Sequence, residues 1–275
     1  MRMVVDSNFL ERQELTEYLA ASTENSIVLT DYVAMEAYKA DTLTSICRRM
    51  TIPCQYPAQV MVLRSTRDAC GLALRADDFA EQIIDPEQSA GFGRFCQALA
   101  LAESGNQKIR QRVLEHGREA REHLERMLCE SDGMMSAITE MAAGFSSQEL
   151  KAIRRPDAAY SDALVSKLAR NIIALSLNLM NSHPDVKKEA PSFQGATDRF
   201  IFRIAICGLV LATRWIAVGG VQGVRPEKIR NDQVDINFAA FATYYDGLFT
   251  ADKKLTELYR ESKAWLNIFG EANPA

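Results

Sequence analysis

The chain has 275 residues, of which 47% are hydrophobic, and a formal net charge of −4. This length and composition are typical of a globular protein with a full core, arranged as one elaborated domain or two small ones. The negative charge excludes a general electrostatic attraction to nucleic acid. Nucleic-acid binding would therefore need local basic clusters or a metal ion.

Three features predict a cytoplasmic protein that does not enter a membrane. The first residues, MRMVVDSNF, turn acidic too early for a secretory signal. The apolar stretch over residues 200–220 is broken by Arg203 and Arg214, which favours a buried core helix over a membrane span. The cysteines form no C-x-x-C pair, so we expect reduced, buried thiols. The six are Cys47, Cys54, Cys70, Cys96, Cys129 and Cys207.

The first part of the chain, residues 1–65, alternates between predicted strands and helices. MRMVVDS, SIVLTD and AQVMVLRST have the composition of strands, and LERQELTEYLAAS and YVAMEAYKADTLTSICRRM have helical periodicity. Such alternation predicts an α/β fold with a parallel sheet.

The middle of the chain, residues 66–190, predicts an all-helical insertion. Its long stretches carry apolar residues at helical spacing with many charges between them. HPDVKKEAPSFQG predicts a linker back into the α/β part, residues 191–275. There we expect the apolar helix, a helix over NDQVDINFAAFATYYD, a strand over GLFTAD and a last helix over KKLTELYRESKAWLNIF.

Carboxylates stand where the predicted strands end. Asp6 follows MVV and Asp252 follows GLFT, and ligands of an open parallel sheet gather at the carboxyl ends of its strands. Asp232 and Asp235 are three residues apart at the start of a predicted helix, which puts them on one face. For Asp232, capping of the first helical turn is an equal alternative.

Glu36 interrupts an otherwise apolar helix face in YVAMEAY. A buried carboxylate there would be costly without a cation or a partner, although a solvated helix glutamate is the alternative. Acids gathered in this way usually hold a divalent cation, so the sequence predicts a site for Mg²⁺ or Mn²⁺. Crowded acids also repel one another, so we expect a raised pKa for at least one of them.

The segments MVVDSN, VLTDYVAMEAYK and DINFAAFATYYDGLFTAD resemble the motifs of PIN-domain nucleases. The resemblance covers both ends of the chain and implies a PIN-like three-layer fold with a central parallel sheet, interrupted by the large all-helical insertion. It implies four catalytic acids that also bind the metal, namely Asp6, Glu36, Asp235 and Asp252. Asp232 would be a further metal ligand. Thr250 would support the metal-site loop and, with Asn8, contact substrate.

The function implied is that of a metal-dependent endonuclease, above all an endoribonuclease, in which a metal-bound water attacks a phosphodiester. Arg225, Lys228 and Arg230 lie just ahead of NDQVD and would bind the RNA backbone. Family habit implies a toxin or defence effector, with an inhibitor or antitoxin protein and a second copy of the chain as partners. Two alternatives remain: a non-catalytic protein-interaction module on a degenerate PIN-like scaffold, and a metal-dependent phosphatase.

Overall fold

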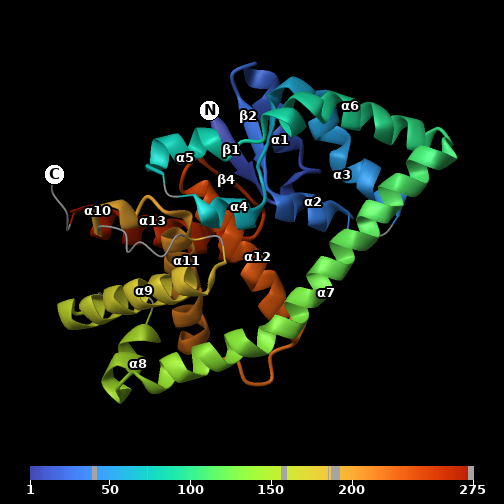
Figure 1. The fold of residues 1–275 in the computed structure, drawn as a ribbon. Coiled ribbons are helices and arrows are strands. Elements are labelled where there is room, and N and C mark those ends of the chain that lie inside the picture. Colours follow the sequence, from blue (N-terminus) through green and yellow to red (C-terminus); the bar gives the residue numbers. More distant parts are fainter. Residues whose placement is uncertain (39–41, 73, 156–159, 185, 187–192, 272–275) are drawn as a thin grey trace.

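A computed structural model of the chain describes residues 1–38, 42–72, 74–155, 160–184, 186 and 193–271 (Figure 1). The strands are β1 (Arg2–Val5), β2 (Ser26–Leu29), β3 (Val60–Val62) and β4 (Gly247–Phe249). The helices up to residue 103 are α1 (Gln13–Ala21), α2 (Asp31–Tyr38), α3 (Leu43–Gln55), α4 (Thr66–Gly71), α5 (Ala76–Gln82) and α6 (Pro86–Glu103). Two 3-10 turns, η1 (Ser7–Phe9) and η2 (Pro57–Gln59), lie among them. The later helices are α7 (Gln107–Ala143), α8 (Ser147–Ile153), α9 (Asp162–Ser182), α10 (Phe193–Ala196), α11 (Phe200–Ala217), α12 (Pro226–Ala242) and α13 (Lys253–Glu271).

The four strands form one parallel sheet in the order β3-β2-β1-β4. In this register Met3 lies opposite Ile27 on one side and Gly247 on the other. Val4, Val5, Ile27 and Val28 are fully buried. Each segment predicted as a strand therefore contains one, and the predicted parallel pairing is confirmed.

The predicted fold class is nevertheless wrong. The structure is 73% helical and only 6% strand over the part of the chain that it describes, so this is a mostly helical protein with a small sheet and not a PIN-like three-layer α/β fold. The physical reason lies in strand length, because each strand has only three or four residues. Helices pack on other helices over most of the core, with α11 against α9, α12 and α13, and α7 against α2, α6 and α12.

Helix α11 is a core helix, as the sequence predicts. The two arginines that interrupt it have protein partners: Arg203 donates from Nη1 to the carbonyl oxygen of Thr243 at 2.8 Å, and Arg214 contacts Glu257 and Glu261. Helices α9 and α11 are long and apolar enough, by length and composition only, to cross a membrane. Two such helices are weak evidence for a membrane protein, because the core helix of a soluble protein has the same length and composition. Of the apolar segment of α11, 72% is buried inside the protein.

The predicted insertion and the two ends of the chain share one hydrophobic core. Helix α7 runs along one side of the molecule from α6 to α8, and packs on α2 and α12 on the way (Figure 1). Residues from all three predicted parts belong to the same buried cluster, for example Val4, Leu124 and Phe238. The predicted boundary at residue 190 lies outside the described residues, and the single helix predicted over residues 32–50 is split into α2 and α3.

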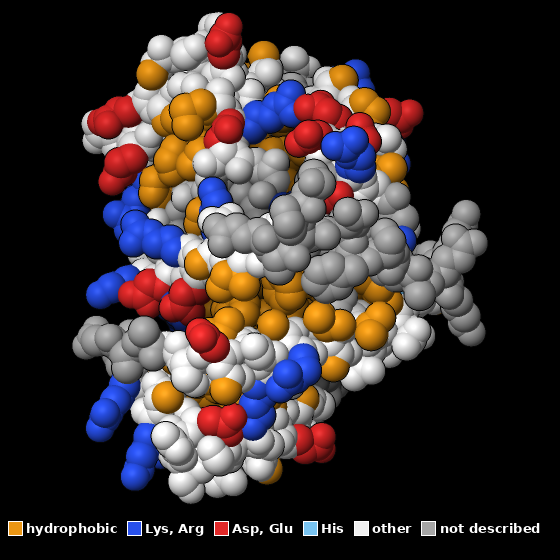
Figure 2. All heavy atoms as spheres, turned by 90° about the vertical axis from the view of Figure 1, so that its left-hand side faces the viewer, with side chains coloured by type: hydrophobic (Ala, Val, Ile, Leu, Met, Phe, Trp, Pro, Cys, Tyr) orange, Lys and Arg blue, Asp and Glu red, His pale blue; other side chains and the backbone are white. Residues whose placement is uncertain are grey.

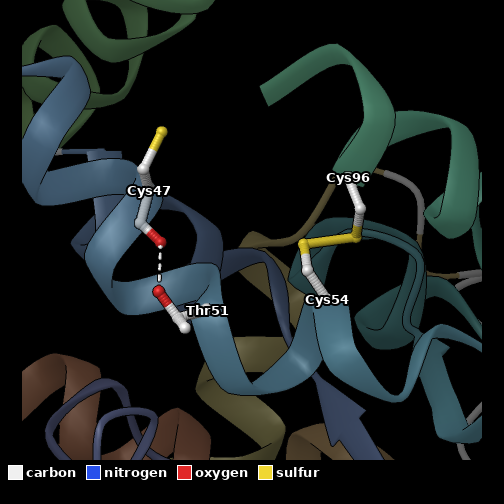
Figure 3. The surroundings of a disulfide bond; sticks show 4 residues. All are labelled: Cys47, Thr51, Cys54 and Cys96. Carbon is white, nitrogen blue, oxygen red and sulfur yellow. Dashed lines mark hydrogen bonds between the residues drawn. A yellow bond between two sulfur atoms is a disulfide. The ribbon is translucent and has the colours of Figure 1, made fainter. Parts of the chain in front are cut away.

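The prediction that all cysteines are reduced is wrong for one pair. Cys54 of α3 and Cys96 of α6 form a disulfide, with their Cα atoms 5.4 Å apart (Figure 3). They are 42 residues apart in sequence, so only the packing of α3 on α6 brings them within bridging distance. Cys47, Cys70 and Cys207 are free thiols, of which only Cys207 is buried, and the Cys129 side chain lies outside the described part.

Candidate functional site

Asp6 lies at the carboxyl end of β1, next to the end of β4. Its backbone N–H donates to the carbonyl oxygen of Phe249 at 2.9 Å, and its side chain is buried. The hydroxyl of Thr250 donates to Oδ2 of Asp6 at 2.7 Å. The parallel sheet thus brings the segments around residues 6 and 250 together, as the strand-end pattern predicts.

Glu36 reaches the same place from α2. The hydroxyl of Ser7 donates to Oε2 of Glu36 and lies 3.5 Å from Oδ1 of Asp6, so Ser7 stands between the two carboxyl groups. Glu36 is half-buried, and the Arg49 guanidinium donates to its backbone carbonyl oxygen at 2.9 Å. The bond from Ser7 and the partial burial favour a role for Glu36 in the site over a solvated helix glutamate.

Asp252 and Asn8 organise the loop that follows β4. Oδ1 of Asp252 accepts hydrogen bonds from the backbone N–H of Lys254 and Leu255, at 2.6 and 3.2 Å, and so caps α13. Oδ1 of Asn8 accepts from the backbone N–H of Ala251 at 2.9 Å. These bonds give Asn8 a positioning role in the loop, while its predicted contact with substrate stays a prediction.

Asp232 has two protein partners. The helix that carries it begins at Pro226, so Asp232 lies in the helix interior and the alternative of first-turn capping is wrong. The indole N–H of Trp215 donates to Oδ2 at 2.7 Å, and the ammonium of Lys254 contacts Oδ1. Asp232 is 3% exposed, and the positive charge of Lys254 offsets the free energy that burial of the carboxylate costs. These contacts use one lone pair on each carboxylate oxygen, so the Trp215 N–H and the Lys254 ammonium would share the oxygens with a metal ion if Asp232 were a ligand.

The pKa of Asp235 shows how closely the acids interact. Burial raises its pKa from the ordinary value to about 8, with smaller contributions in the same direction from Asp6, Asp232 and Asp252. The charge of Lys254 acts against this rise. Asp235 therefore keeps its proton near neutral pH when nothing else offsets its charge.

Asp6 has a raised pKa as well. Burial is the largest cause, and the nearby Glu36 charge adds to it, whereas the hydrogen bond from Thr250 lowers it; the result is a pKa of about 6. Both Asp6 and Asp235 thus have the raised pKa that was expected, but burial is its largest cause and the crowding of the acids is a smaller one. Asp6, Glu36, Asp232, Asp235 and Asp252 are called the acid cluster below.

The fit of the acid cluster to a divalent cation is limited by its geometry. Within the described ranges, no three His, Cys, Asp or Glu side chains are placed to hold one metal ion together. Mg²⁺ keeps several waters and is commonly bound by one or two carboxylates, so two acids suffice. Asp6 and Asp235, whose charges disfavour each other, have the donor chemistry that such an ion requires.

Of the three predicted backbone-binding residues, the structure brings only Lys228 beside the acid cluster. Its ammonium lies 4.7 Å from the centroid of the Trp215 ring, and that ring binds Asp232. Arg225 is exposed just before α12, and the Arg230 guanidinium donates to Oδ1 of its neighbour Asn231 at 3.0 Å. In the part of the chain that the structure describes, neither arginine contacts the acids.

Sequence reasoning missed Ser7, Trp215 and Lys254. Ser7 directly follows Asp6 and Lys254 is two residues after Asp252, so a polar residue close to a strand-end acid was an available signal. Trp215 gave none, because it is 17 residues from Asp232 and on a different helix.

Comparisons of the chain with protein-family models, curated proteins and solved structures give no match. Function is therefore inferred from the residues of this chain alone.

Proposed function

We propose that the chain is a metal-dependent nuclease that hydrolyses phosphodiesters, most of all in RNA, with the acid cluster as its site. The observation that carries the proposal is the state of Asp235, a half-buried acid whose pKa is raised to about 8 by burial and by three other carboxyl groups. Strongly perturbed acids gathered at the ends of parallel strands favour a functional site over a structural one.

Asp6 and Asp235 would hold Mg²⁺ or Mn²⁺. The bound ion would supply an acidified water and offset charge on the phosphate. Thr250 donates to one oxygen of Asp6, and Ser7 lies between the carboxyl groups of Asp6 and Glu36, so these contacts hold the two carboxyl groups near each other. Asp235 has to lose its proton before it can bind a cation, so cation binding should release a proton and weaken as the pH falls.

The resemblance of the strand-end motifs to those of PIN-domain nucleases supports RNA as the substrate, and it does so from sequence motifs alone. The three-layer fold that the family would bring is not part of the proposal. A role as a toxin or defence effector, an inhibitor or antitoxin partner, pairing with a second copy and a cytoplasmic location follow from the same resemblance and from composition.

The test is hydrolysis of single-stranded RNA, single-stranded DNA and a phosphate monoester, each with Mg²⁺, with Mn²⁺ and with a chelator. The variants are Asp6→Asn and Asp235→Asn, with Asp77→Asn as a matched control, because Asp77 is exposed on α5. We expect RNA cleavage that needs the metal and falls by at least about 100-fold in both site variants, the upper end of losses for changes around a metal site. The control should cleave as the wild type does.

Metal-independent cleavage of equal rate in all four proteins would contradict the proposal. Hydrolysis of the phosphate monoester alone would favour the phosphatase. Calorimetric titration with Mn²⁺ gives a second readout, in which Asp235→Asn should bind the ion more weakly than wild type. Thermal melting of each variant shows that it remains folded.

A further inference from the structure

A cavity of about 870 Å³ opens between α8, α9, α11 and α13. Its volume is within the range of small-molecule sites, roughly 300–1,000 Å³. The chain has two tryptophans, Trp215 and Trp265, and both line this cavity. Figure 2 shows the side of the molecule that carries α9 and α13, where hydrophobic side chains gather next to Lys and Arg side chains.

The lining of the cavity is positively charged in an otherwise acidic protein. It contains four cations and two acids, a net charge of +2, whereas the whole chain carries −4. Both acids, Glu257 and Glu261, pair with Arg214 at 3.3 and 2.6 Å. The cavity therefore favours an anion.

Two of the cations remain for a ligand. Lys254 contacts Asp232, but neither Arg154 nor Lys228 has an acidic partner among the described residues. Both are exposed. An anionic group that reached them would gain charge-assisted hydrogen bonds without breaking an ion pair.

Aromatic and apolar side chains form the rest of the lining. Trp265 and Tyr160 are half-buried and line the cavity. Val218 and Ile268 line it as well, and 76% and 40% of their surfaces are exposed. Nucleobases stack on aromatic side chains, whichever of the bases they are, because each base has a flat π-face. The lining is therefore suited to a nucleobase.

The cavity borders the acid cluster through two of its own residues. Trp215 and Lys254 line the cavity and both bind the Asp232 carboxylate. The Lys254 charge also acts on Asp235. A ligand in the cavity would thus lie next to residues that bind Asp232 of the acid cluster.

We propose that this cavity binds a nucleotide, with its phosphate at Lys228 and Arg154 and its base against Trp265 and Tyr160. A free nucleotide and one unit of a single strand present the same chemistry. That the bound nucleotide belongs to a nucleic-acid strand rests on the proposed function, whereas the existence of a nucleotide site does not.

Because both tryptophans line the cavity, their fluorescence reports directly on it. The titration is done with a chelator present, so that no cleavage occurs, and uses AMP, UMP, an oligouridylate and inorganic phosphate. We expect saturable quenching by the nucleotides and the oligonucleotide. Lys228→Gln and Arg154→Gln should each weaken binding about tenfold, as expected for one hydrogen bond to a charged group.

Lys108→Gln is the matched control, because Lys108 is exposed in the first turn of α7, which begins far from α8 (Figure 1). It should bind as the wild type does. Tighter binding of the oligonucleotide than of AMP or UMP would identify a strand as the ligand, and the reverse would identify the free nucleotide. Absence of saturable quenching, equal affinities in all variants, or equally tight binding of inorganic phosphate would each overturn the proposal.

The same titration with Asp6→Asn separates this proposal from the nuclease. Asp6 does not line the cavity, so the variant should bind nucleotides unchanged even where cleavage is lost. A protein that binds nucleotides but never cleaves would refute only the nuclease. One that cleaves without nucleotide-induced quenching would refute only the cavity.

Discussion

The Thr250 hydroxyl donates to Oδ2 of Asp6 at 2.7 Å, which joins two residues 244 positions apart. The same hydroxyl oxygen accepts the backbone N–H of Asp252 at 3.0 Å. One side chain therefore fixes a buried carboxylate of β1 and the loop that leads into α13. This pair of bonds makes Thr250 a residue that positions the acid cluster.

Replacement of Thr250 by valine should raise the pKa of Asp6 further, because the hydrogen bond from Thr250 stabilises the ionised form. A hydrogen bond to a charged group is worth about 1.5 kcal/mol or more, so the shift should be about one pH unit. The part of the acidic limb of Mn²⁺ binding that Asp6 sets, near pH 6, should move upward by that amount, below the part that Asp235 sets near pH 8. Thr250→Ser keeps the hydroxyl and should leave the limb in place, and an unmoved limb in Thr250→Val would refute the role.

Asp235→Asn should change how stability depends on pH. The folded-state pKa of about 8 lies above the ordinary value of 3.8, so between these limits the folded protein binds more protons than the unfolded chain. The contribution of Asp235 to stability is therefore complete below pH 4 and is lost as the pH rises toward 8. Asp235→Asn has no carboxyl group at this position, so its stability does not fall with rising pH for this reason.

At pH 8 without metal, Asp235→Asn should be more stable than wild type by at least about 1 kcal/mol, since one pKa unit corresponds to about 1.4 kcal/mol. Urea unfolding at pH 5, 6, 7 and 8 measures the difference. Asp6 has a pKa of about 6, so some pH dependence below that value should remain in the variant. A constant difference across the four pH values would contradict the raised pKa.

Lys254→Met should destabilise the protein, because it leaves the Asp232 charge buried without a cation. The Lys254 side chain is 34% exposed, so the cost should be about 2 kcal/mol, less than the roughly 3–5 kcal/mol of a fully buried pair. The double variant Asp232→Asn/Lys254→Met should recover much of the loss, which a double-mutant cycle measures by urea unfolding. Additive losses would show that the two charges do not interact.

Removal of the disulfide should lower stability. The bridge closes a loop over a sequence separation of 42, for which chain entropy predicts about 2–4 kcal/mol. The melting temperature of the wild type should fall in reductant, and Cys54→Ser/Cys96→Ser should melt at that lower temperature with or without reductant. Six titratable thiols in the unreduced, denatured wild type would show that the bridge does not form.

The sequence by itself determined the local elements and the acids at their ends. Short apolar runs predicted the segments that contain β1, β2, β3 and β4, because the preference of residues such as Val and Ile for strands is read from neighbouring residues. Helical periodicity likewise predicted the middle of the chain. Asp6 and Asp252 were found because an acid that follows a buried run is visible in the sequence.

Only the tertiary structure decided the fold class and the chemistry around each acid. Strand length depends on where helices such as α2 begin, so the sheet is far smaller than the sequence pattern indicated. The contact of Asp232 with Trp215 and the Cys54–Cys96 bridge join different helices. No periodicity encodes such contacts, because they depend on how distant surfaces pack and on the burial that packing produces.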